Sequence, residues 1–141
     1  MYPILRRLLL LLVITAAAGW ASGAGDRFSV RDYGASGDGR TLDTPAINAA
    51  IEAAAHAGGG TVVLPAGDYL CYSIRLRSRI TLHLSAGATL IAAEPPPAGQ
   101  PGGYDAPEAN AWNEYQDFGH SHFRNSLIWG EDLVDLAITG P

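Results

Sequence analysis

The spacing of apolar residues is helical in one early segment of the chain and extended in most of the later segments. Between residues 44 and 57 a mostly alanine face recurs at helical intervals, at Ile47, Ala50, Ile51, Ala54 and Ala55. We expect Thr44 to cap this helix, Pro45 to occupy its first position, and the three glycines 58–60 to end it. A face of small side chains predicts close packing against a flat partner.

After residue 60 the apolar positions alternate with a period of two, which is typical of β-strands. The runs are short, rich in β-branched or apolar residues, and bounded by Gly, Pro or Ser. They are Thr61–Leu64, Tyr69–Ile74, Ile80–Leu84, Thr89–Ala92, Ser126–Trp129 and Val134–Thr139. A further short strand is expected at Phe28–Val30, before the glycine-rich loop 33–39, whose glycines allow positive φ in a tight connection.

An internal repeat links two of these strands. Thr61–Leu70 matches Thr81–Leu90 at an offset of 20 residues, with identical residues at five of the ten positions. A period near 20 indicates a solenoid, and the leucine-rich-repeat pattern is absent. The sequence therefore predicts an all-β fold, a right-handed parallel β-helix, with one N-terminal α-helix that covers the open end of the stack.

The first 24 residues have the three-part pattern of a secretory signal peptide. Arg6 and Arg7 precede a short apolar run at residues 8–14, and small residues follow at 21–24. A membrane anchor is the alternative, but the run is short for a span of about 20 residues. We expect a signal peptide at 1–24, a β-helix domain at 25–141, and a secreted or periplasmic protein without a stable membrane anchor.

Composition narrows the possible partners. The net charge of the chain is -5, and the 9 basic residues are all arginine. Without Arg6 and Arg7 the count becomes 14 acidic against 7 basic residues, a net charge of -7. Such an acidic chain lacks the clustered basic surface that nucleic acids require, so we expect no nucleic-acid partner. Cys71 is the only cysteine, and its place in an alternating run predicts a buried core residue.

Several motifs together resemble a known family. Glycines and apolar residues recur at characteristic intervals in the segments 33–47, 58–69, 76–90 and 133–140, with a polar and aromatic segment at 115–131. This pattern resembles the N-terminal region of the pectin-active β-helix proteins. The resemblance is to glycoside hydrolase family 28, the polygalacturonases and rhamnogalacturonases, within the wider pectate-lyase-like superfamily.

The resemblance implies inverting acid/base hydrolysis of pectic polysaccharides, galacturonan or rhamnogalacturonan, by a monomeric parent without a cofactor. The family's catalytic motifs are Asn-Thr-Asp, an adjacent Asp pair, Gly-His-Gly and Arg-Ile-Lys, and none of them occurs here. We therefore expect an N-terminal fragment that contains no catalytic residue and is inactive alone. Two alternatives stay open: a pectate lyase on the same fold, and a non-catalytic carbohydrate-binding β-helix.

A polar and aromatic segment supplies the candidate substrate-binding residues. They are expected to stack on sugar rings and to form hydrogen bonds with them beside a groove: Trp112, Tyr115, Asp117, His120 and His122. Folding of this segment over the side of the coil, without contact to sugar, is the alternative. His120 and His122 share one side of an extended segment, but no Cys or third His lies nearby in sequence, so we expect no metal site.

The carboxylates earlier in the chain have a simpler interpretation than catalysis. Asp38 and Asp43 lie on either side of a short segment before the predicted helix, where loop stabilisation and helix capping are the expected roles. His83 lies in an alternating strand and is expected to be structural or to face outward.

Overall fold

The computed structural model describes residues 26–109 and 123–141, so the predicted signal peptide lies outside the described residues. In the described ranges the chain forms short strands, one 3-10 helix, η1 (Val30–Tyr33), and one α-helix, α1 (Thr44–His56). The strands are β1 (Arg27–Ser29), β2 (Asp38–Leu42), β3 (Gly60–Leu64), β4 (Gly67–Cys71), β5 (Ile74–Arg75), β6 (Ile80–Leu84), β7 (Ala88–Ala92), β8 (Ile128–Trp129) and β9 (Ala137–Thr139).

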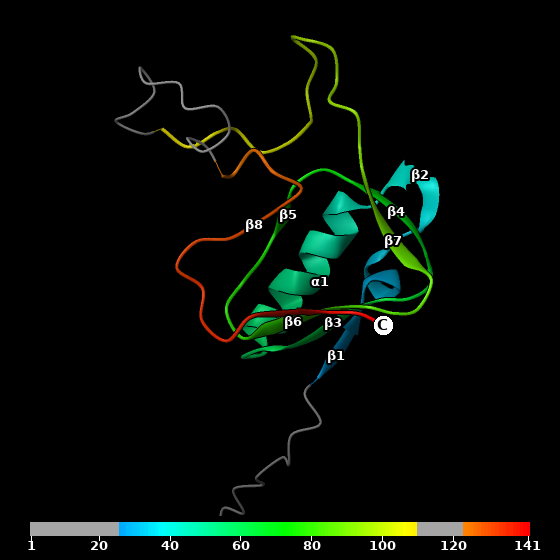
Figure 1. Cartoon of the computed structure of the whole chain (residues 1–141), viewed down its shortest axis with the longest axis vertical. Coiled ribbons are helices and arrows are strands. Elements are labelled where there is room, and N and C mark those ends of the chain that lie inside the picture. Colours follow the sequence, from blue (N-terminus) through cyan, green and yellow to red (C-terminus); the bar gives the residue numbers. More distant parts are fainter. Residues whose placement is uncertain (1–25, 110–122) are drawn as a thin grey trace, which may run out of the picture.

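These strands form three parallel sheets, which make the three sides of a coil (Figure 1). The sheet orders are β1-β3-β6-β9, β2-β4-β7 and β5-β8. From β3 onward each turn of the chain adds one strand to each sheet in the same order, so β3, β4 and β5 form one coil and β6, β7 and β8 the next. The predicted parallel β-helix is therefore confirmed.

Helix α1 replaces the third strand of the first coil, because it follows β1 and β2 directly and precedes β3. It lies across the interior of the ring in Figure 1 and packs against β1, β3 and β5. The alanine-rich face is buried there, with Ile47, Ala50, Ile51 and Ala54 fully inaccessible to solvent. The small side chains let the helix lie close to the strands, which confirms the predicted cap.

The 20-residue repeat appears directly in the register of one sheet. Strand β3 pairs with β6 at an offset of 20, from Gly60 opposite Ile80 to Leu64 opposite Leu84. Strand β4, however, pairs with β7 at an offset of 21, with Gly67 opposite Ala88. The second half of the predicted alignment is therefore wrong by one residue, because the corner at 85–87 holds one more residue than the corner at 65–66.

Inward side chains stack in rows along the coil. One row contains Phe28, Val62, Leu82 and Ile138, which lie opposite one another in successive strands. Val62 and Leu82 are fully buried, whereas Ile138 in the last strand is 53% exposed because no further coil covers it within the described residues. Exposed Val134 and Leu136 lie close by in sequence, so this end of the stack is apolar.

The start of α1 differs from the expectation. Thr44 is its first helical residue, and Asp43 occupies the N-cap without a side-chain capping bond. The Thr44 hydroxyl instead accepts a hydrogen bond from the backbone N–H of Tyr72 at 2.7 Å. Thr44 as cap is therefore wrong, because its hydroxyl is used to fix the corner of the next coil.

Asp43 stabilises the preceding loop, as expected for one of its two suggested roles. Its carboxylate is 1% exposed and accepts hydrogen bonds from the N–H groups of Ser36 at 2.6 Å and Gly37 at 2.9 Å. Asp38 likewise accepts from the backbone of Arg40 and Thr41 and from the Thr41 hydroxyl. Those hydrogen bonds hold the pKa of Asp38 far below its usual range.

Two strand boundaries also differ. The predicted strand Tyr69–Ile74 is broken at Tyr72 and Ser73, where the chain turns from β4 into β5. The loop predicted at 33–39 overlaps η1 and β2, since Asp38 already pairs with Asp68 of β4. Cys71 is buried as predicted, and burial raises the pKa of its thiol to about 11. No helix in the described ranges has the length and apolarity that crossing a membrane requires.

We expect Asp43→Ala to destabilise the chain by about 1–3 kcal/mol, because it leaves two loop N–H groups without their buried acceptor. The measurement is urea unfolding followed by circular dichroism. Asp32→Ala, at an exposed carboxylate in η1, is the matched control and should change stability by less than about 0.5 kcal/mol. Equal effects of the two substitutions would contradict the role given to Asp43.

Candidate functional site

A long segment separates β7 from β8 and interrupts the coil, and we call residues 93–127 the insertion. All five predicted sugar-binding residues fall within it, but they lie outside the described residues: Trp112, Tyr115, Asp117, His120 and His122. The structure describes both stems of the insertion, 93–109 and 123–127. The described part of the site therefore consists of the contacts that hold these stems to β5 and β8.

A single buried hydroxyl joins the two stems. Ser73 is 3% exposed and lies at the corner between β4 and β5. Its oxygen accepts a hydrogen bond from the N–H of Asp105 at 2.9 Å and donates one to the carbonyl of Ser126 at 2.8 Å. A hydroxyl can donate and accept at once, so one side chain fixes both stems of the insertion to the same corner.

Asp105 extends this anchor onto the outer face of β5 and β8. Its carboxylate accepts two hydrogen bonds from the Arg75 guanidinium, one of them from Nε at 2.7 Å, and one from the Trp129 indole N–H at 2.7 Å. Arg75 on β5 and Trp129 on β8 lie directly opposite each other in the ladder. The hydrogen bond from Arg75 is the main cause that lowers the pKa of Asp105, against desolvation that raises it.

A second carboxylate closes the insertion where it returns to the coil. Glu108 accepts hydrogen bonds from the N–H groups of Phe123 at 2.7 Å and Arg124 at 3.0 Å. The Arg124 side chain pairs with Glu131 at 2.6 Å and lies over the Trp129 ring, 5.4 Å from its centroid. Glu108 therefore brings residues 108 and 123 together at the two limits of the segment that holds the predicted sugar-binding residues.

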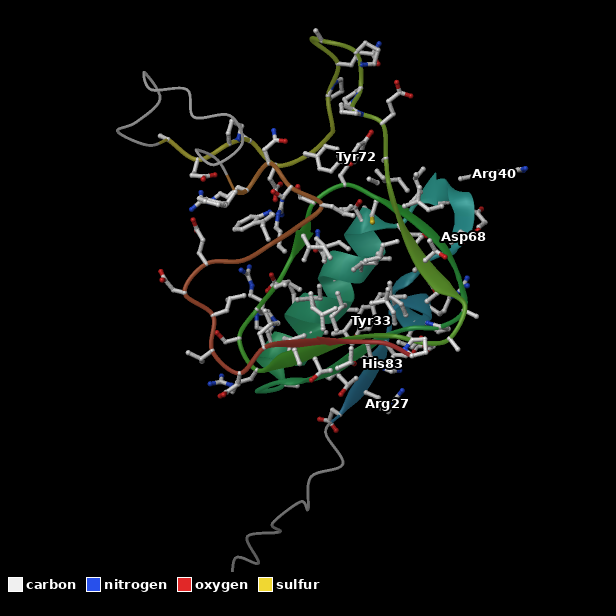
Figure 2. The ribbon with its side chains drawn as sticks, in the orientation of Figure 1. Arg27, Tyr33, Arg40, Asp68, Tyr72 and His83 are labelled. Carbon is white, nitrogen blue, oxygen red and sulfur yellow. The ribbon has the colours of Figure 1, made fainter. Side chains whose placement is uncertain are left out.

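Two tyrosines fasten the first stem to the coil. Tyr72, at the corner where the stem passes the coil in Figure 2, packs edge-on against Tyr104 with ring centroids 5.3 Å apart. Their hydroxyls donate to the backbone carbonyls of Glu94 and Ala93, respectively. This Pro- and Gly-rich stem is thus held by side-chain contacts, since it forms no strand of its own.

Most of the contacts in this site were not predicted from the sequence. Asp105 lies in a Pro- and Gly-rich loop and Arg75 next to a predicted strand, and nothing local connects two residues 30 positions apart. Within the described ranges no group of three His, Cys, Asp or Glu side chains is placed to hold a metal ion. His83 contacts Thr139 at 2.9 Å on the outer side of its sheet, as expected (Figure 2).

An apolar hollow of about 650 Å³ opens beside Trp129 at the last coil. It is lined by Leu76, Phe123, Ser126, Ile128, Trp129, Gly130, Leu133, Leu136 and Ile138. Most of these side chains belong to β8 and to the chain that comes after it. The hollow therefore lies at the uncovered end of the coil, and few of the side chains that line it carry polar groups for chemistry.

Known proteins resemble the chain over different lengths. Residues 27–92 match the family described as rhamnogalacturonase A/epimerase, pectate lyase-like. A probable polygalacturonase of Vitis vinifera is 33% identical over 120 residues, covering 79% of this chain and 22% of the plant protein. Alginate lyase 7 of Azotobacter vinelandii is 64% identical over 42 residues, 30% of this chain and 5% of the lyase.

A solved structure supports the same relationship. The family 28 exopolygalacturonase of Yersinia enterocolitica matches with a TM-score of 0.61 and 33% identity, covering 84% of this chain and 20% of the enzyme. The chain thus has the fold of a right-handed parallel β-helix. It is similar to the family 28 polygalacturonases over about four-fifths of its length, in agreement with the resemblance of the sequence motifs. It spans about a fifth of the length of the polygalacturonases that it matches.

We expect Ser73→Ala to loosen both stems at once, because it removes the acceptor for Asp105 and the donor for Ser126 together. The expected loss of stability is about 1–3 kcal/mol, with faster amide hydrogen exchange at Asp105. Ser126→Ala is the matched control, because it removes a hydroxyl at the partner position but keeps the carbonyl that accepts from Ser73. Unchanged exchange at Asp105 in Ser73→Ala would argue against a shared anchor.

Asp105 should make the anchor sensitive to acid. Its folded-state pKa lies below the ordinary value of 3.8, so its stabilisation is present above that value and is lost as the pH falls through the lower one. The difference in unfolding free energy between the wild-type chain and Asp105→Asn should therefore be constant well above pH 3.8 and shrink as the pH falls below that value. A difference that does not change as the pH falls below 3.8 would show that the charge of Asp105 is irrelevant.

Proposed function

We propose that the protein is a secreted glycoside hydrolase acting on pectic polysaccharides, galacturonan or rhamnogalacturonan, by inverting acid/base hydrolysis. The proposal rests mainly on the 33% identity to both the plant polygalacturonase and the Yersinia exopolygalacturonase, each over about four-fifths of the chain. In this proposal the described residues form the capped N-terminal coils, and the catalytic carboxyls belong to coils beyond the 141 residues. The signal peptide at 1–24 would direct export to the periplasm or the medium.

The chemistry of the described carboxylates supports this division of labour. Inverting hydrolysis requires one protonated carboxyl and one carboxylate about 6.5–9.5 Å apart, with a water molecule between them. Asp105 is held in its ionised form by Arg75 and Trp129, and Glu131 is paired with Arg124. A carboxyl whose pKa is lowered is a poor proton donor near neutral pH, so Asp105 is suited to positioning rather than to acid catalysis.

The insertion is the part of this chain that we assign to substrate binding. Its stems are fixed beside β8, and the segment between them contains Trp112, Tyr115, Asp117, His120 and His122. Aromatic side chains stack on the C–H faces of sugar rings, and carboxylate and imidazole groups form hydrogen bonds with hydroxyls. These residues would form one wall of a groove for the polysaccharide. No cofactor is required for this role.

A lyase is the second candidate, and the match to alginate lyase 7 is the observation that favours it. A lyase would abstract the proton next to the uronate carboxylate and leave an unsaturated product. Hydrolysis instead adds water and leaves a reducing end at each cut without a double bond. The two reactions are therefore separated by ultraviolet absorbance of the product. A chelator also separates them, because a pectate lyase would usually require Ca²⁺ and the proposed hydrolase would not.

The decisive experiment begins with the gene beyond codon 141. We expect the reading frame to continue into Asn-Thr-Asp, paired Asp, Gly-His-Gly and Arg-Ile-Lys motifs. The longer product should release reducing ends from polygalacturonate or rhamnogalacturonan in the presence of a chelator, whereas the 141-residue chain alone should not. Hydrolysis by the short chain would overturn the division of labour, and a chelator-sensitive unsaturated product would replace hydrolase by lyase.

A further inference from the structure

The outer face of β5 and β8 carries an indole ring with two guanidinium groups beside it. Arg75 lies directly opposite Trp129 in the parallel ladder, so their side chains leave the sheet on the same side. Arg124 approaches from the second stem of the insertion, with its guanidinium carbon 5.4 Å from the centre of the Trp129 ring. We call these three side chains the Arg–Trp–Arg row.

Each guanidinium is oriented by a carboxylate of the protein along only one edge. Arg75 uses Nε and Nη2 to bind Asp105, and Arg124 uses Nε and Nη2 to bind Glu131. A guanidinium has five N–H donors in a rigid plane, and these bonds use two of them. The two side chains remain 51% and 41% exposed, so their outer edges face solvent.

This arrangement suits an anion that also has an apolar surface. A carboxylate binds the flat edge of a guanidinium with two parallel hydrogen bonds. A sugar ring presents C–H groups that pack on an aromatic side chain. A uronic acid residue combines both features in one unit. A neutral sugar would pack on the indole ring alone and would leave the free guanidinium N–H groups bonded to water.

Nearby charges determine how the row would act on its ligand. Asp105 and Glu131 pair with the two guanidinium groups, and the Glu108 carboxylate also acts on Arg124, so the row does not attract a polyanion over long distances. The row therefore contributes to recognition only when the ligand is in contact with it, because its N–H donors are already oriented. The row should therefore discriminate free carboxylates from esters more strongly than it raises overall affinity.

We propose that Arg75, Trp129 and Arg124 form a binding site for the carboxylate of a uronic acid residue of the polysaccharide. This inference rests on the proposed function, because it assigns a charged subunit of the substrate to a particular surface beside the insertion. It assigns Arg75 and Arg124 a role in specificity, in addition to their ion pairs with Asp105 and Glu131.

The test is titration of the chain with oligogalacturonate and with its methyl ester, followed by NMR of the arginine side-chain N–H groups. The wild-type chain should bind the free acid at least about tenfold more tightly than the ester, with shifts at Arg75 and Arg124. Arg75→Lys and Arg124→Lys keep the charge but lose the flat edge, and each should weaken acid binding about tenfold.

Arg77→Lys is the matched control. Arg77 is an exposed arginine paired with Glu52 and lies outside the row. The Arg77→Lys substitution should leave binding of the free acid unchanged. Thermal melting will confirm that each variant folds. Equal affinity for acid and ester, or lysine variants that bind like the wild-type chain, would overturn the site while leaving the proposed pectin activity intact. Failure of the wild-type chain to bind the acid would overturn the site, whereas the proposed function is decided separately by the longer gene product.

Discussion

The ladder of parallel backbone hydrogen bonds between successive coils is the constraint on which the rest of the structure depends. Because parallel strands pair residue by residue, every side chain in one coil has a fixed neighbour in the next. The row Phe28, Val62, Leu82 and Ile138 is one result of this pairing. The placement of Arg75 opposite Trp129 is another, on the outer side of a different sheet. Core and surface thus follow from the same register.

The ladder also explains where the chain tolerates change. The corner at 85–87 holds one more residue than the corner before it, yet both flanking sheets keep unbroken pairing. At another corner, between β7 and β8, the insertion is accommodated in the same way. Corners absorb added residues because their backbone groups are not part of the ladders. The added residues of this chain, the insertion among them, therefore lie beside the sheets and not within them.

The sequence predicted the fold well because solenoid signals are local and repeated. The change of period after residue 60, the repeat at Thr61 and Thr81, and the alanine-rich helix each needed only a short window. Contacts of the insertion were not predictable in this way, because Ser73 meets Ser126 and Arg75 meets Asp105 across long stretches of chain. Thr44 shows the same limit. Its hydroxyl is suited to capping the helix, but it accepts a hydrogen bond from the N–H of Tyr72, which lies in a later coil.

Helix α1 makes the N-terminal end of the stack different from the other end. It fills the place of a strand in the first coil, so β5 meets a helix on one side and β8 on the other. Ribosomes deliver the N-terminal segment first, and domains generally fold in that order during synthesis. The helix and its two strands can thus form a template before later coils emerge, and each new coil then adds to a finished surface. The coils of this protein would therefore assemble in order from the N-terminal end, starting at the alanine-rich face of one short helix.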